Sequence, residues 1–247
     1  MRFSRWRVLY QESMTPDSEL LAHFVKTSSE DAFAELVRRH LGLVHAAALR
    51  QVAGDEHLAR DVVQVVFTDL ARKAASLTRR DSLAGWLYTS ARHTAANVVR
   101  SEVRRRRRED EFMREPDQMA VADSSPAELA GEWNQLAPCL DQVMHDLKEV
   151  EREALLLRFF QNQPYAEVGA RLGMNENTAR MRVERALGKL RTAFARRGVV
   201  TTAALSAALS VHAAPASGLL PGAVAGSAIA GAAASASVLL PLMSATT

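Results

Sequence analysis

The chain has 247 residues, 48% of them hydrophobic and 24% charged, a composition that supports hydrophobic cores and excludes disorder throughout. Its formal net charge is only +3, but basic residues cluster around 79–108 and 171–197, which favours a polyanionic partner over an evenly solvated surface. A single cysteine, Cys139, and the lack of a secretory signal in the first residues lead us to expect a cytoplasmic protein.

Residues 1–17 form a predicted N-terminal arm, and translation starts at either Met1 or Met14. After Met14, Thr15 and Pro16 are typical of a helix cap followed by the first helical residue. This arrangement predicts that the folded part of the protein begins just after the second methionine.

Residues 18–108 follow a helical period almost throughout, and no alternating strand pattern of useful length appears. Gly54 and Asp55 are expected to end one helix and to cap the next. The pattern predicts an all-α domain over these residues.

The helix after Asp55 has two contrasting faces. Its inward stripe is apolar and consists of Leu58, Val62, Val63, Val66, Phe67 and Leu70. Its other face carries two carboxylates and a glutamine, and consists of Asp61, Gln64, Val65, Thr68 and Asp69. Such a face is either a docking surface or simply solvated, and the residues alone leave both interpretations open.

The next helix ends in a strongly basic segment. Its outer side collects Arg92, His93, Asn97 and Arg100, and its last residues are Arg104, Arg105, Arg106, Arg107 and Arg108. Five consecutive arginines repel one another unless solvent or phosphate surrounds them. We therefore expect an anionic partner, with a solvated basic helix end as the alternative.

Residues 109–127 are acidic and rich in proline and serine, and they form a predicted linker to a second helical domain, 128–197. That domain contains two short amphipathic helices around Gly173, where a positive φ is cheap, and Asn175, which is placed to cap the second helix. The pattern predicts a helix-turn-helix. The free face of its second helix consists of Asn177, Arg180, Met181, Glu184 and Arg185. This face suits a DNA major groove, although an ordinary solvated helical hairpin would look similar.

Two separated segments carry a resemblance to a known family. The run 61–67, followed by Gly85-Trp86-Leu87-Tyr88 and Ala91-Arg92, resembles region two of bacterial RNA polymerase sigma factors. The runs 153–160, 165–168 and 180–191 look like sigma region four. Both regions in this order, with only a short linker between them, resemble the small extracytoplasmic-function group. The resemblance implies an all-α protein of two small helical domains joined by a flexible linker, the second ending in the helix-turn-helix.

The resemblance also implies roles for the faces described above. The face at 61–69 would bind the clamp helices of the polymerase β′ subunit, and Arg92, His93, Asn97 and Arg100 would contact the minus-10 promoter element. The residues implied to contact the minus-35 element are Asn177, Arg180, Met181, Glu184 and Arg185. Those implied to contact phosphates are Arg104, Arg105, Arg106, Arg107, Arg108, Thr178, Arg182 and Lys189. Such a protein assists promoter opening for transcription initiation, is not an enzyme, needs no cofactor, and is often held by an anti-sigma protein.

The sequence departs from the family pattern in both proposed contact regions. Val62, Val63 and Val66 stand where relatives carry an Asp-Leu or Glu-Asp pair and an acidic residue, which puts details of the polymerase contact in doubt. Around the proposed minus-10 helix, His93 and Asn97 replace residues frequent in the family, as do Thr89 and Ser90. These changes predict an unusual minus-10 preference.

The tail, 198–247, carries no Asp, Glu, Lys or Arg and is rich in alanine, glycine and serine. It is interpreted as a flexible tail, as a weak membrane-associating helix, or as a segment that folds back onto the sigma domains to regulate them. Two alternative functions depend on one part of the chain only. The helix-turn-helix alone would make a free-standing DNA-binding regulator, and the tail alone would make a membrane-tethered interaction protein.

No catalytic or metal-binding constellation appears in the sequence, and His40 and His45 are expected to be core or surface histidines.

Overall fold

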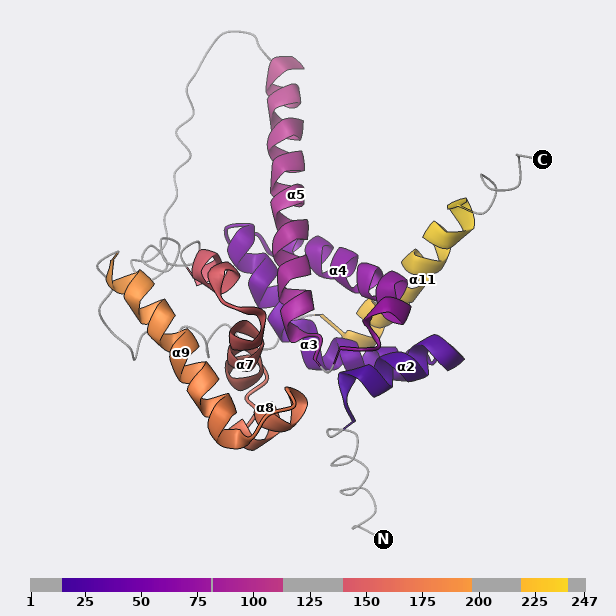
Figure 1. The fold of residues 1–247 in the computed structure, drawn as a ribbon. Coiled ribbons are helices and arrows are strands. Elements are labelled where there is room, and N and C mark those ends of the chain that lie inside the picture. The colour runs from indigo at the N-terminus through magenta and orange to yellow at the C-terminus, as the bar shows by residue number, and fades with distance from the viewer. Residues whose placement is uncertain (1–14, 81, 113–139, 197–218, 240–247) are drawn as a thin grey trace, which may run out of the picture.

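The computed structural model describes residues 15–80, 82–112, 140–196 and 219–239 (Figure 1). The predicted N-terminal arm up to residue 14, most of the predicted linker, and Cys139 lie outside the described residues. The part of the chain that the structure describes forms helices and contains no strand, so the expected all-α class is confirmed.

The first domain consists of α2 (Asp17–Thr27), α3 (Glu30–Gln51), α4 (Glu56–Leu77) and α5 (Ala84–Phe112). Side-chain caps set where two of these helices begin: the Ser29 hydroxyl accepts from the Ala32 N–H, and Asp55 accepts from two N–H groups at the start of α4. Gly54 adopts a φ of 86°, as expected for a helix end.

The start of α2 differs by one residue from our expectation. Pro16 is the N-cap of α2, with an extended ψ of 150°, and is not its first helical residue. Its carbonyl oxygen accepts hydrogen bonds from the N–H groups of Glu19 and Leu20. Because proline lacks an N–H group and has a fixed φ, it fits either position at the beginning of a helix.

The core of the first domain lies between α3, α4 and α5. The predicted inward stripe of α4 is confirmed, because Val62, Val63, Val66, Phe67 and Leu70 are fully buried and Leu58 packs against them. Burial of side chains of this size stabilises the fold by about 1.5–3 kcal/mol each before conformational entropy is subtracted. α4 therefore has one face fixed in the core and presents its other face outward.

The second domain consists of a helical segment at 140–146, then α7 (Glu149–Phe159), α8 (Tyr165–Arg171) and α9 (Glu176–Ala195). The predicted helix-turn-helix is formed by α8 and α9: Gly173 has a φ of 62°, and the Asn175 side chain accepts from the Thr178 N–H at 2.8 Å. A Cβ at Gly169 would lie 2.7 Å from the Met174 carbonyl oxygen, so the tight turn requires glycine there.

Polar side chains join the two domains. The fully buried Asp17 of α2 contacts the His40 ring at 2.8 Å and the Arg171 guanidinium of α8 at 3.7 Å. The same His40 ring contacts the Gln161 amide at 2.9 Å. Burial would by itself raise the pKa of Asp17, but His40 and then Arg171 outweigh that effect and hold the pKa well below the usual carboxyl range. The carboxylate is therefore an ionised link between the domains.

A second buried carboxylate lies at the same boundary. Asp141 accepts hydrogen bonds from the Tyr88 hydroxyl at 2.6 Å and the Gln51 amide at 2.5 Å, and forms an ion pair with Arg50 at 3.3 Å. Burial, and next the charge of Asp141, raise the pKa of Tyr88 above its ordinary value, so the phenol remains a donor. These contacts attach the helical segment at 140–146 to α3 and α5.

Part of the C-terminal tail forms α11 (Pro221–Leu239), which packs against α3 and α4 (Figure 1). The interpretation of the tail as flexible is therefore wrong for these residues, because the inward side chains of α11 join the core of the first domain. Among the described residues, no helix is both long and apolar enough to cross a membrane.

Candidate polymerase and nucleic-acid interfaces

The outer face of α9 is open to solvent along the positions predicted to face DNA. Its inner stripe of Ala179, Val183, Ala186 and Leu190 is buried. The predicted minus-35 residues are all exposed: Asn177, Arg180, Met181, Glu184 and Arg185. A helix held in this way by its apolar side can enter a major groove with its polar side chains intact.

Two ion pairs organise the basic side chains of α9. Arg180 pairs with Glu184 one turn later at 3.0 Å, and Lys189 pairs with Glu151 of α7 at 2.5 Å. Of the residues predicted to contact phosphates on this helix, Lys189 is exposed, and Thr178 and Arg182 are half-buried. The Lys189 ammonium is therefore shared with a carboxylate when no DNA is bound, whereas Arg185 forms no ion pair with another of the described residues.

The predicted minus-10 residues lie on α5, with His93, Asn97 and Arg100 exposed. Arg92 is half-buried, and its guanidinium lies 3.5 Å from the Gln142 side-chain oxygen of the second domain. The Arg100 guanidinium donates to the Asn97 side-chain oxygen at 2.5 Å. The second domain therefore touches one end of this surface and leaves its other three residues accessible.

The arginine run lies in the last turns of α5, which continues to Phe112, so the first four residues of the predicted linker are helical. Arg104, Arg105, Arg106 and Arg108 are exposed, whereas the side chain of Arg107 lies outside the described residues. Glu102 accepts from Arg105 at 2.7 Å and from Arg106 at 3.0 Å, and these hydrogen bonds lower the pKa of Glu102 to about 2. The Glu102 carboxylate offsets part of the charge of the run, and the exposed Arg104 and Arg108 are suited to phosphate.

The outward face of α4 is mixed in its exposure. Asp61 and Val65 are exposed, and Val65 keeps 45% of its surface accessible. Gln64, Thr68 and Asp69 are half-buried. The Asp69 carboxylate lies within 3.8 Å of both Arg72 and Lys73, so its charge is partly matched within the helix.

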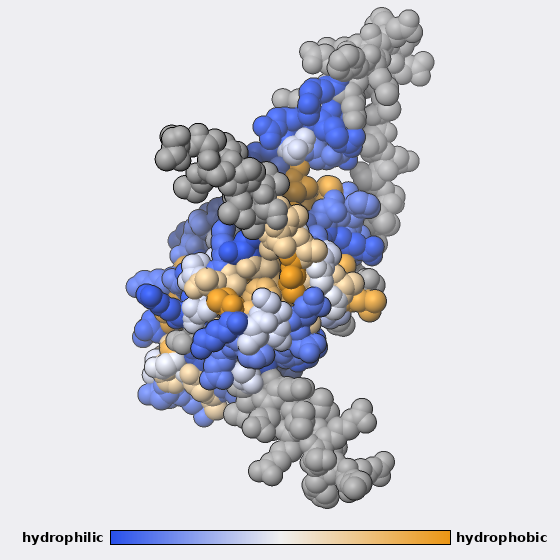
Figure 2. All heavy atoms as spheres, turned by 90° about the vertical axis from the view of Figure 1, so that its right-hand side faces the viewer, coloured by the Kyte–Doolittle hydropathy of each residue, from blue (hydrophilic) through white to orange (hydrophobic). Residues whose placement is uncertain are grey.

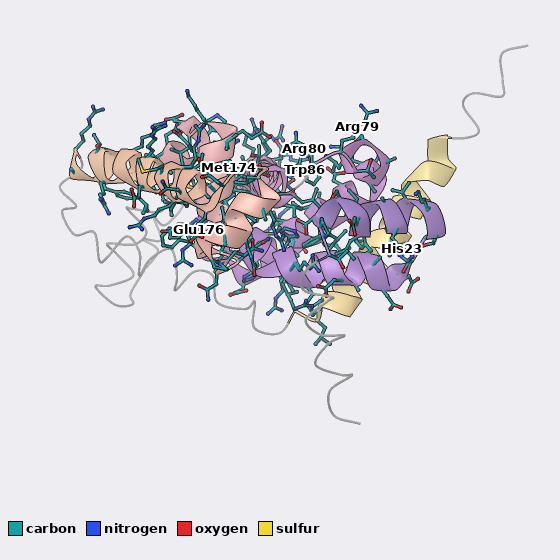
Figure 3. The ribbon with its side chains drawn as sticks, turned by 60° about the horizontal axis from the view of Figure 1, so that its bottom comes forward. His23, Arg79, Arg80, Trp86, Met174 and Glu176 are labelled. Carbon is teal, nitrogen blue, oxygen red and sulfur yellow. The ribbon has the colours of Figure 1, made fainter. Side chains whose placement is uncertain are left out.

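The three faces are carried by different helices and do not meet in one pocket. Figure 3 shows Met174 and Glu176 at the turn between α8 and α9, and Arg80 and Trp86 at the connection between α4 and α5. Trp86 lies 5.9 Å from the Lys73 ammonium, and Arg80 pairs with Glu149 of α7 at 2.8 Å. Sequence reasoning missed these two contacts between elements, because only the tertiary fold brings the partners together.

The histidines singled out from the sequence have structural partners. His40 is fully buried between Asp17 and Gln161, and His45 lies 3.1 Å from a Glu56 carboxylate oxygen. The expectation of core or surface histidines is confirmed for both. Within the described ranges, no group of three or more histidine, cysteine or acidic side chains could hold a metal ion.

Comparison with known protein families gives two matches, in the order expected. Residues 36–109 match the model of Sigma-70 region 2, and residues 138–190 match the model of Sigma-70, region 4. Together these segments cover about half of the chain. A free-standing helix-turn-helix regulator would account for the second match and not for the first.

Individual proteins similar to this chain are also sigma factors. RNA polymerase sigma factor CarQ of Myxococcus xanthus is 28% identical over 67% of this chain and 91% of its own. ECF RNA polymerase sigma factor SigK of Mycobacterium sp. strain KMS is 29% identical over 69% of this chain and 86% of its own. RNA polymerase sigma factor SigZ of Bacillus subtilis is 28% identical over 56% of this chain and 73% of its own.

No solved structure matches this chain. The region 2 match spans most of α3, all of α4 and most of α5, and the region 4 match spans α7, the helix-turn-helix of α8 and α9, and its preceding helical segment. The chain therefore belongs to the extracytoplasmic-function type of bacterial RNA polymerase sigma factors, which recognise promoters as subunits of the polymerase.

Proposed function

We propose that the outward faces of α4, α5 and α9 each carry out a separate binding step of a sigma factor. The face of α4 binds the β′ clamp helices of core polymerase, α5 with its basic end holds the minus-10 element as it opens, and α9 recognises the minus-35 element as duplex. The observation that carries this division is the exposure of α9 and α5 residues whose opposite sides are fixed in the core. The protein contributes binding energy and performs no covalent chemistry itself.

The face of α4 can be tested by binding to core polymerase. Asp61→Ala together with Gln64→Ala removes a charge and an amide from this face without touching the buried stripe. We expect the double variant to bind core polymerase on the order of tenfold or more weakly, because polar groups at an interface lose their partners. Glu19→Ala removes an exposed acid from α2 and is the matched control. Equal loss in both variants would contradict a specific polymerase surface on α4.

The face of α9 can be tested with promoter DNA recovered by selection with the assembled polymerase. Arg185→Ala should reduce binding by about 1–3 kcal/mol and relax the preference at one base pair, if the guanidinium binds a base edge. Arg191→Ala, an exposed arginine later on the same helix, is the control for charge alone. A uniform loss across all sequences in both variants would restrict α9 to phosphate contacts.

The basic end of α5 can be tested by salt dependence. Replacement of Arg104 and Arg108 by glutamine leaves the pairs of Glu102 with Arg105 and Arg106 in place. Each lost phosphate contact should reduce the slope of log affinity against log salt by about 0.7–0.9. An unchanged slope would place this helix end away from the DNA.

A further inference from the structure

The C-terminal helix α11 packs on α3 and α4 and reaches one edge of the proposed polymerase face. Its inward residues, Val224, Ala225 and Ala228, are buried, and Ile229 packs against the same core. These positions follow a helical period of three to four residues, so one side of α11 faces α3 and α4 along its first three turns. Seen from the side of α11, Figure 2 shows tan and orange residues at the centre of a largely hydrophilic face.

The contact reaches a residue of the proposed polymerase face. A Cβ at Gly231 would lie 3.3 Å from the Thr68 methyl carbon and 3.5 Å from its hydroxyl oxygen. The Thr68 hydroxyl already donates to the Gln64 carbonyl oxygen at 2.8 Å, so its hydrogen bond is satisfied within α4. The backbone of α11 at Gly231 therefore lies close to Thr68, and a Cβ at this position would be a tight contact with the Thr68 methyl group.

We propose that α11 is an intramolecular competitor for core polymerase, seated on the edge of the surface that polymerase needs. The inference rests on the proposed role of the α4 face. Asp61 and Val65 remain exposed beside the covered Thr68, so polymerase can begin to bind while α11 is in place and must displace it to complete the contact. Binding is then reduced by the fraction of molecules in which α11 is bound to the first domain.

The composition of α11 suits a helix that can dissociate from the first domain. Across its described side chains it carries no charge, and it contributes no salt bridge to the domain it covers. Its buried side chains are small, with only valine and isoleucine larger than alanine. Because the apolar area they bury is small, their release costs less than the release of a core helix. The close approach at Gly231 leaves little room for a larger side chain, yet the packing of α11 on the first domain is weak.

Glycines on opposite sides of α11 provide a matched pair of variants. Gly231→Leu places a side chain against Thr68, whereas Gly226→Leu points into open space on the exposed side. Both changes raise helix propensity equally. We expect Gly231→Leu to bind core polymerase on the order of tenfold more tightly than the unaltered chain, and Gly226→Leu to bind like it. Hydrogen exchange along α3 and α4 should increase only in Gly231→Leu.

A second variant covers the case in which Gly231→Leu is accommodated by a shift of the helix. Ala228→Asp introduces a charge at a fully buried position of α11 and leaves every proposed polymerase contact unchanged. It should also increase the affinity for polymerase. If both variants raise hydrogen exchange on α4 while the affinity stays unchanged, α11 does not compete and the proposal is overturned.

The role of the α4 face is tested separately in the same assay. Asp61→Ala with Gln64→Ala, combined with Gly231→Leu, should lose the affinity gained. If Asp61→Ala with Gln64→Ala weakens binding but neither α11 variant strengthens it, the proposed function stands and the competition by α11 is wrong. If no variant binds core polymerase at all, the proposed function and the competition fail together.

Discussion

The interior of the first domain is almost wholly apolar, whereas the boundary between the two domains adds buried ion pairs to its apolar packing. Between α3, α4 and α5 the buried side chains are almost all apolar, with Phe33, Phe67 and Leu70 at the centre. At the boundary, Asp17 of the first domain contacts Arg171 of the second, and Asp141 of the second domain binds donors from the first. Apolar burial depends little on pH, whereas contacts between ionised groups do. Apolar side chains of both domains belong to one continuous core, so the buried carboxylates add to the apolar packing at the boundary and make it depend on pH.

The largest effect should come from the apolar interior. Phe67→Ala removes a fully buried ring from α4 and should lower the free energy of unfolding by about 3–5 kcal/mol. Urea unfolding followed by circular dichroism measures the change. Because the boundary is untouched, the contacts of Asp17 and Asp141 should persist in the folded fraction. An equal loss from Val65→Ala, on the exposed side of α4, would contradict the assignment of the core.

The next largest effect should come from Asp17→Asn at the boundary. The variant leaves the charge of Arg171 without its partner and should cost about 3 kcal/mol, as breaking a buried ion pair does. In contrast to Phe67→Ala, we expect the domains to separate before their helices unfold. Small-angle scattering should then show expansion while the helical content is retained. Loss of both signals together would mean that the boundary is part of a single cooperative core.

The stability of the fold at acidic pH should depend on the ionisation of Asp17. The pKa of Asp17 in the folded protein lies below its usual value of 3.8, so its ionised form stabilises the fold above that value. The stabilisation should be lost as the pH falls below about 4 toward the lowered pKa. Thermal unfolding measured between pH 3 and pH 6 should show this slope in the unaltered chain, and a shallower one in Asp17→Asn.

A smaller effect of opposite sign is expected at Glu153 of α7. Its side chain is buried beside Gly85 of α5, its Oε1 atom has no hydrogen-bond partner among the described residues, and burial raises its pKa. A raised carboxyl pKa stabilises the fold at acidic pH and ceases to do so as the pH rises through the raised value. Glu153→Gln should therefore stabilise the protein by about 1 kcal/mol near neutral pH. A destabilised variant would mean that the charge of Glu153 is needed at the boundary.

Local rules were sufficient to predict much of the fold. Helical periodicity located the buried stripe of α4, and the glycine and capping residues Gly54, Asp55, Gly173 and Asn175 marked where helices end and begin. These signals are contained in a few adjacent residues, so no tertiary information is needed to recognise them. The position of Pro16 was wrong by one residue, because either place satisfies proline.

Each candidate face could also be predicted from local sequence, because all its residues lie on one helix and the helical period determines which side of the helix they occupy. The sequence could not show that Thr68 is covered by Gly231, nor that Gln142 reaches Arg92. Those partners are separated by long stretches of chain, and no spacing rule connects them.

The sequence by itself determined the all-α class, the helix-turn-helix and the family, because each depends on periodicity, caps and short motifs. Tertiary structure alone decided that Asp17 links the domains through His40 and Arg171, and that α11 lies on α3 and α4. An uncharged run of alanine, glycine and serine is compatible with several conformations. The helical conformation of 221–239 is selected by packing on α3 and α4, where Gly231 allows a close approach to Thr68.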